Sequence, residues 1–362
     1  MSRNMISYVK HLFETIVDDY PLSTIKEMRL KQSDDPVQYA KDLYEFQKVK
    51  LLNQDRLFHN ILVAELAIDT NRYILFNFSM SALEDESIPN ISSLGANIVN
   101  IHAGLFLMLV KELNLKIKKR ISTGYLEQYI YYQQEDSNYD GHEIDDLKNC
   151  FDEMVLFQIE SDSILDDQEY QNISYFICSY FQNIILLPFE DLVDYFRIML
   201  CSNIPGLPKE NIFLSLTSTH WKHAFLELYR CIEWVYSIPR AMLLKKKMNI
   251  SLSAVEIVKH CRSELGWKRK EMDSIKKLFE QLPKTILNDS GLFYSNPFNV
   301  ATYSLNTPDE TKRSLEKIGE KIYDIRNQLV HQKEVQNSII LYDKDWKPII
   351  AFLLYAITEI YS

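Results

Sequence analysis

Apolar residues recur at helical spacing along most of the chain, and one early segment has the composition of strands. Residues 6–17 form an amphipathic helical pattern. Residues 60–69 and 72–79 are rich in Ile, Leu, Val, Tyr and Phe, and Thr70-Asn71 between them predicts the turn of a hairpin. Residues 98–115 then predict a buried helix, and residues 129–132 form a strand-prone run. The first half of the chain is therefore expected to mix helices with strands.

The segment from Pro205 to Pro208 is the strongest break in the pattern, and the chain beyond it is almost purely helical. A helix is predicted to start at Thr307 as N-cap, with Pro308 in its first position and Glu310 completing a capping box. Its apolar positions are spaced 3, 4, 3 and 4 residues apart, at Leu315, Ile318, Ile322, Ile325 and Leu329. The other predicted helices cover residues 221–247, 251–265, 268–282 and 345–361.

Length and composition agree with two mainly helical domains. A chain of 362 residues exceeds one ordinary core, and only 8 of them are glycine, fewer than tight-turned barrels and sandwiches use. We place the domain boundary near residue 205, between an α+β domain of residues 1–204 and a helical domain of residues 205–362. The fold class expected is mainly α.

Charge is divided unevenly between these two parts. Residues 1–204 carry 17 Lys and Arg against 32 Asp and Glu, a net charge of −15. Residues 205–362 carry 23 against 18, a net charge of +5, so this part can meet a polyanion although the whole chain is acidic. Two clusters are the candidate RNA-binding residues, although solvated helix ends would explain them equally well. They are Lys245, Lys246 and Lys247, and Lys268, Arg269 and Lys270.

Several common classes of protein are disfavoured by what the sequence lacks. Its five cysteines form no CxxC pair, which argues against a disulfide framework or a structural zinc site. No apolar stretch approaches the roughly 18 residues of a membrane span, and residues 1–5 begin no apolar signal core. We therefore expect a cytoplasmic protein that needs no metal or other cofactor. No glycine-rich phosphate loop or hydrolase elbow occurs.

The hexapeptide from Arg326 to His331 is the pattern with chemical potential. Asn327 and His331 are four residues apart and share a helix face, whereas Arg326 and His331 differ by roughly 140° around an ideal helix. An arginine presents a rigid fork of donors to a phosphodiester and stabilises developing charge. A histidine titrates near neutrality and can move a proton to or from a ribose hydroxyl.

This Arg-Asn-x-x-x-His pattern resembles the RNxxxH motif of the HEPN superfamily of ribonucleases, and all three fixed positions match. The family's domain is a helical bundle with a long early helix, for which residues 221–247 are the candidate. The resemblance implies a C-terminal HEPN-like bundle, metal-independent RNA cleavage with 2′,3′-cyclic phosphate products, and a homodimer that joins two motifs. Arg326 would bind phosphate, His331 would be the general acid or base, and Asn327 would assist.

The resemblance also suggests a supporting acid on the long early helix that holds the motif arginine, with Glu227 and Glu233 as candidates. Residues 1–204 would then be a sensing or regulatory domain, triggered by a phage component or a nucleotide. Such two-part proteins resemble regulated toxins of abortive infection and anti-phage defence, and tRNA is one candidate target. The alternative is a catalytically inactive HEPN-like scaffold that binds RNA or protein, with His331 packed under Trp346 or Phe352 of the final helix.

Overall fold

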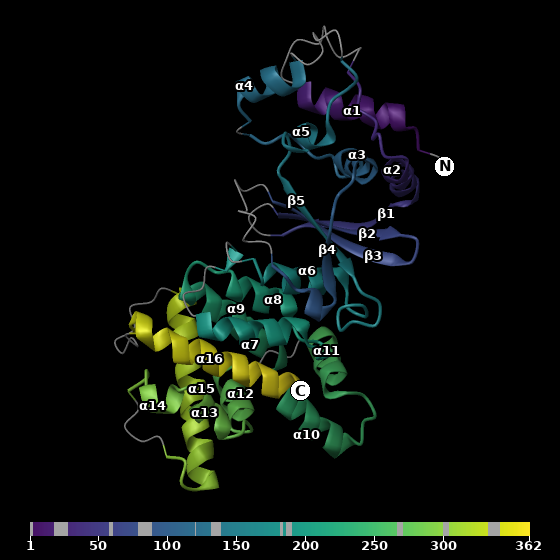
Figure 1. Ribbon diagram of the computed structural model, residues 1–362. Helices are drawn as coiled ribbons and strands as arrows, with labels where there is room; N and C mark the ends of the chain where they lie inside the picture. Colours follow the sequence, from purple (N-terminus) through teal and green to yellow (C-terminus); the bar gives the residue numbers. More distant parts are fainter. Residues whose placement is uncertain are drawn as a thin grey trace. The chain divides into compact units, whose positions relative to one another are not determined.

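The computed structural model separates the chain into two compact units, Met1–Ser174 and Tyr175–Ser362 (Figure 1). The division lies earlier than the predicted boundary near Pro205, because helix α7 (Glu190–Cys201) packs on later helices, α8 and α16. The structure describes residues 3–17, 28–57, 61–78, 89–119, 121–131, 139–181, 184–185, 190–265, 271–299, 304–331 and 341–362.

The N-terminal unit contains a five-stranded antiparallel sheet in the order β1-β2-β3-β5-β4. The predicted hairpin is confirmed as β2 and β3, whose ends pair Ile68 with Asn71. The turn is therefore Asp69-Thr70, one residue earlier than expected, and Asp69 adopts a left-handed φ of 53°. The strands are β1 (Lys50–Arg56), β2 (Ile61–Ile68), β3 (Asn71–Phe78), β4 (Ala96–Val99) and β5 (Glu153–Ile159).

The helices of this unit gather on one side of the sheet (Figure 1). The most buried of them is α3, in which every residue from 104 to 110 is buried. Gly104 allows α3 to approach α2 closely, since a Cβ there would come within 1.8 Å of the Asp42 carbonyl oxygen. These helices are α1 (Met5–Val17), α2 (Pro36–Lys48), α3 (Ala103–Glu112), α4 (Thr123–Leu126) and α5 (Ile144–Lys148), with a short 3₁₀-helix η4 (Ser92–Leu94) and a short π-helix η5 (Glu127–Tyr131).

Two sequence expectations in this unit need correction. The buried helix predicted over residues 98–115 is α3 only from residue 103, because Ile98 and Val99 belong to strand β4 instead. The strand-prone run at residues 129–132 is helical in η5 as far as Tyr131, since Ser122 caps the preceding turn by accepting from the Tyr125 N–H.

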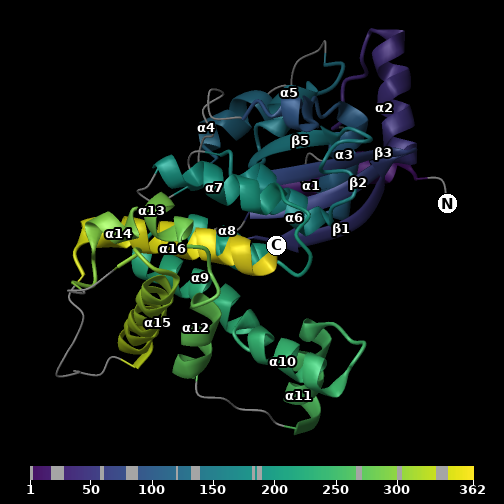
Figure 2. The same cartoon turned by 90° about the horizontal axis from the view of Figure 1, so that it is seen from below.

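The C-terminal unit is a helical assembly in which α9 and α16 pack along each other and α15 packs on α12 and α9 (Figure 2). Helix α6 (Tyr170–Cys178) spans the division between the units. The remaining helices are α8 (Lys209–Leu216), α9 (Trp221–Val235), α10 (Ile238–Met248), α11 (Ala254–Leu265), α12 (Glu271–Phe279), α13 (Thr285–Asp289), α14 (Leu292–Ser295), α15 (Pro308–His331) and α16 (Asp343–Tyr361). None of the helices among the described residues is long and apolar enough to cross a membrane.

The predicted long helix over residues 221–247 is wrong as a single element. It is two helices, α9 and α10, because Pro239 lies in the first turn of α10 and lacks the N–H that would continue α9. The helix predicted from Thr307 is confirmed as α15, and the Thr307 hydroxyl accepts from the Glu310 N–H at 3.2 Å. The Glu310 carboxylate accepts from the Ser304 hydroxyl.

Candidate functional site

The buried stripe of α15 determines where the side chain of Arg326 points. Leu315, Ile318, Ile322 and Ile325 are all at most 2% exposed and face the other helices. Arg326 directly succeeds the last of these residues, so it lies at the edge of the buried face rather than on the solvent side. Its side chain is 20% exposed, which is low for an arginine and requires partners for its charge.

Those partners come from two other helices and from the motif itself. The Nη2 atom of Arg326 donates to the Oε1 atom of Glu233 on α9 at 3.1 Å, and Nη1 donates to Asn327 Oδ1 at 3.0 Å. Glu271, the first residue of α12, lies 3.9 Å from Nη1 and adds a weaker ion pair. The guanidinium also lies 5.8 Å from the centre of the Tyr229 ring.

Of the two supporting acids predicted on α9, the structure brings Glu233 to Arg326 and holds Glu227 elsewhere. The Glu227 carboxylate accepts from the Asn211 Nδ2 atom at 2.7 Å and pairs with Arg230. The sequence does not predict the contributions of Glu271 and Tyr229. Glu271 comes directly after a basic cluster at the start of a helix, which gives no sign of a contact with a residue so much later in the chain.

Tyr229 is a buried polar group beside this ion-pair cluster. Tyr229 is 1% exposed, and its hydroxyl has no hydrogen-bond partner among the described residues. Burial raises the pKa of this phenol strongly, and the negative charge of Glu233 adds to the rise. Tyr229 therefore stays neutral and presents an aromatic face to Arg326.

A cavity of about 520 Å³ opens beside the arginine. Trp234 is 65% exposed, although large aromatic side chains usually bury most of their surface. Arg230 lies four residues before Trp234 and hence on the same face of α9. The lining residues are Arg230, Glu233, Trp234, Tyr236, Glu271 and Arg326.

The remaining predicted site residues are placed only in part. His331 is the last residue of α15, and its side chain lies outside the described part of the structure. Lys245, Lys246 and Lys247 occupy the last turn of α10, where cations suit the helix dipole. Residues 268–270, the second basic cluster, lie outside the described residues.

The two aromatic residues considered as a cover for His331 have other neighbours. The ring of Trp346 packs against those of Trp221 and Phe225, with centres 5.2 and 5.7 Å away. The Phe352 ring lies 5.4 Å from that of Phe279. These contacts anchor α16 to α9 and α12.

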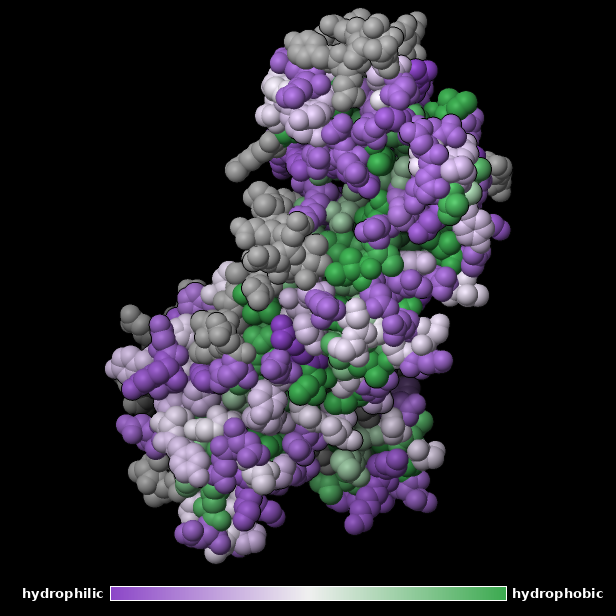
Figure 3. Space-filling model, in the orientation of Figure 1, coloured by the Kyte–Doolittle hydropathy of each residue, from purple (hydrophilic) through white to green (hydrophobic). Residues whose placement is uncertain are grey.

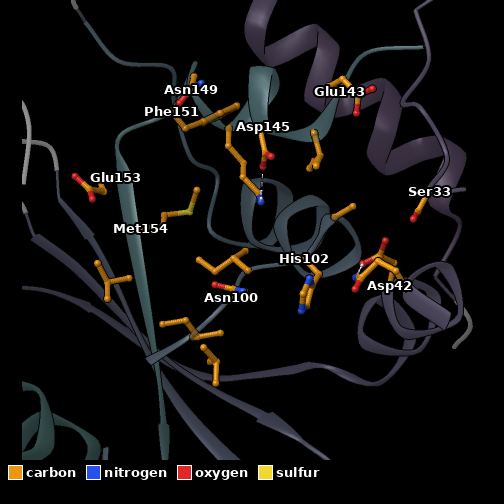
Figure 4. Close-up of a pocket in the computed structure, with 18 of the residues that line it drawn as sticks. Ser33, Asp42, Asn100, His102, Glu143, Asp145, Asn149, Phe151, Glu153 and Met154 are labelled. Carbon is orange, nitrogen blue, oxygen red and sulfur yellow. Dashed lines mark hydrogen bonds and ion pairs between the residues drawn. The ribbon is translucent and has the colours of Figure 1, made fainter. Parts of the chain in front are cut away.

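The N-terminal unit holds a second, larger hollow of about 900 Å³ (Figure 4). Asn100 and His102 reach it from the segment before α3, and Asp42 reaches it from α2. The Nε2 atom of His102 lies 3.0 Å from the Lys41 ammonium. Burial lowers the pKa of His102, and the positive charge of Lys41 lowers it further. Figure 3 shows hydrophobic side chains exposed near the sheet of this unit, and Ile98, which lines the hollow, is 47% exposed.

The hollow mixes both charge signs without concentrating metal ligands. Lys148 pairs with Asp145 at 3.1 Å, and Lys31 pairs with Glu143 at 2.7 Å. Within the described ranges, no group of three or more His, Cys, Asp or Glu side chains could hold a metal ion.

Comparison with protein-family models, with curated proteins and with solved structures finds no match to this chain.

Proposed function

We propose that this chain is an endoribonuclease of the HEPN type that cleaves RNA without a metal ion at Arg326, Asn327 and His331. The observation that supports this proposal best is the contact between Glu233 and Arg326, because the resemblance predicts an acid on the early helix at this place. A second support is the cavity beside Arg326, which leaves room for a substrate next to the guanidinium.

The chemistry depends on the donors that remain on Arg326. A guanidinium carries five N–H groups, and its hydrogen bonds to Glu233 and Asn327 use two of them. The remaining donors can bind a phosphodiester and stabilise the charge that grows on its oxygens. Because Glu233 and Asn327 hold the guanidinium, little reorganisation is needed when the substrate arrives.

His331 would carry the proton in this reaction. The ribose 2′-oxygen attacks phosphorus and gives up its proton, while the bond from phosphorus to the 5′-oxygen breaks and that oxygen takes up a proton. The products are a 2′,3′-cyclic phosphate and a 5′-hydroxyl end. Arg326 and His331 diverge by about 140° on one helix, so we propose a homodimer in which each chain's arginine serves the other's histidine.

The test is cleavage of total RNA and of tRNA in EDTA by the full chain, beside Arg326→Ala and His331→Ala. We expect cleavage that both substitutions abolish, with cyclic phosphate on the 5′ fragment. Cleavage that survives His331→Ala would refute the site. Light scattering on the same samples tests the dimer, and mixing the two inactive variants tests whether arginine and histidine come from different chains.

The biological setting proposed is that of a regulated toxin in anti-phage defence. The N-terminal unit, with its acidic sequence and its large hollow, would receive the trigger, a nucleotide or a phage component. Full-length protein should then cleave RNA faster after the trigger is added.

A second candidate function is an inactive HEPN-like scaffold that binds RNA or protein. It is favoured by the two carboxylates, Glu233 and Glu271, that already neutralise Arg326, as in a purely structural ion-pair network. Tight RNA binding without cleavage, in the presence of every trigger tested, would support this function.

A further inference from the structure

The cavity beside Arg326 has a composition that suits a nucleobase better than a second phosphate. Its charged lining consists of two arginines, Arg230 and Arg326, and two glutamates, Glu233 and Glu271, so its formal charge is zero. A second phosphate inside the cavity would meet both of these carboxylates at a cost in repulsion. A neutral ring with hydrogen-bonding edges would not, and about 520 Å³ is within the roughly 300–1,000 Å³ of small-molecule sites.

Trp234 supplies the surface on which such a ring would stack. Its indole is 65% exposed and borders the cavity, and it is the next residue after Glu233, which holds the motif arginine. An exposed aromatic side chain next to a cationic group is the usual platform for a base of single-stranded nucleic acid. Arg230, one helical turn before Trp234, provides a cation on the same face.

Glu271 supplies an acceptor for the edge of the base. Its carboxylate is 3.9 Å from the Arg326 Nη1 atom, which is too long for a hydrogen bond, whereas Glu233 is held at 3.1 Å. Guanine presents two parallel N–H donors, at N1 and N2, and these match the two oxygens of one carboxylate. Uracil presents only a single ring N–H, between two carbonyl oxygens that a carboxylate would repel.

We propose that Trp234 and Glu271 form a base-recognition subsite that selects guanine in single-stranded RNA next to the cleaved phosphate. This proposal rests on the proposed function, because it takes the ligand to be RNA. Trp234 would be the stacking surface and Glu271 the residue that sets specificity. Arg326 would then bind the phosphate that is attached to the recognised nucleotide.

The test measures RNA binding in the absence of cleavage. Anisotropy with the full-length His331→Ala protein in EDTA compares a labelled nine-residue uridine oligomer with one carrying a single central guanosine. We expect at least fivefold tighter binding of the guanosine oligomer. Adding Trp234→Ala should weaken the binding of the guanosine oligomer about tenfold, whereas adding Trp234→Phe should keep its affinity within about threefold of that of the His331→Ala protein. Adding Glu271→Gln should remove the guanosine preference, so that the two oligomers bind with equal affinity.

Tyr294→Ala is the matched control, because Tyr294 is an aromatic residue 76% exposed on α14, outside the cavity lining. Equal binding of both oligomers, or unchanged binding after Trp234→Ala, would overturn the subsite. The subsite would also be overturned if light scattering showed that Trp234→Ala converts a dimer into monomers, since Trp234 would then belong to a protein interface. Failure of the ribonuclease proposal looks different: guanosine binding would depend on Trp234 while the wild-type protein cuts nothing.

Discussion

Replacing Glu233 with glutamine removes one charge from the Arg326 cluster and keeps the shape of the side chain. At 3.1 Å, two unit charges attract by on the order of 5 kcal/mol in an effective dielectric of about 20. Desolvation opposes this attraction, because the two side chains are only 20% and 30% exposed. Glu271 also stays at 3.9 Å and keeps part of the compensation. We therefore expect the free energy of unfolding to fall by about 1–2 kcal/mol.

The assay is urea unfolding in a double-mutant cycle with Arg326→Ala, together with cleavage kinetics. We expect a coupling of about 1–2 kcal/mol between the two positions. A guanidinium that is no longer held should lose a similar amount of transition-state stabilisation, which is roughly a 5- to 30-fold fall in kcat/KM. Glu227→Gln is the matched control, since Glu227 is on the same helix and pairs with Arg230 instead. Its cleavage rate should stay within about twofold of wild type.

Two results would refute this reasoning. Additive effects of Glu233→Gln and Arg326→Ala on unfolding would mean that the contact contributes nothing to stability. Equal losses of cleavage in Glu233→Gln and Glu227→Gln would mean that the effect comes from the charge of α9 as a whole, and not from the position of Arg326.

Three further predictions concern stability. Tyr229→Phe should raise the free energy of unfolding by about 1 kcal/mol in urea titrations, because it removes a buried hydroxyl with no hydrogen-bond partner among the described residues; a loss of 2 kcal/mol would reveal a partner. Gly104→Ala should cost about 3 kcal/mol by forcing α3 away from the Asp42 carbonyl, whereas Gly124→Ala, with open space around its Cβ, should be neutral or stabilise by about 0.5 kcal/mol. Because the pKa of His102 is lowered in the folded protein, the unfolded chain binds more protons than the folded one just below about pH 6.5. The free energy of unfolding should therefore keep its full value above that pH and fall as the pH decreases. His102→Gln should flatten this fall in thermal melts between pH 5 and 7, and an unchanged slope would contradict the assignment.

Local patterns in the sequence predict those elements whose stability is decided locally. The cap at Thr307 and the regular stripe from Leu315 to Ile325 specify α15 without reference to any other segment. Strand β5 is not predicted, because its pairing with β3 and β4 brings together segments far apart in the sequence and is visible in neither alone. The break between α9 and α10 is hidden by the continuous helical pattern around it, although Pro239 marks its place.

The site can be predicted from the sequence only where a motif or a short spacing defines it. Arg326 and Asn327 are neighbours in the chain, so their hydrogen bond is a consequence of the motif itself. The choice of Glu233 over Glu227 depends on how α9 is rotated, and the contribution of Glu271 depends on where α12 begins. Both are decided by tertiary packing, which a single sequence does not display.

The rotation of α9 about its axis explains why this one helix both holds Arg326, through Glu233, and exposes Trp234 to solvent. Phe225, Leu228 and Ile232 are fully buried at successive turns, so the helix cannot rotate without opening the core. Glu233 and Trp234 come directly after Ile232 and emerge at the edge of that buried face, where Glu233 meets α15 and Trp234 meets solvent. Side chains placed in this way are held by the packing of the bundle rather than by a loop. That rigidity is what an arginine must have if it is to stabilise a phosphate at a fixed position.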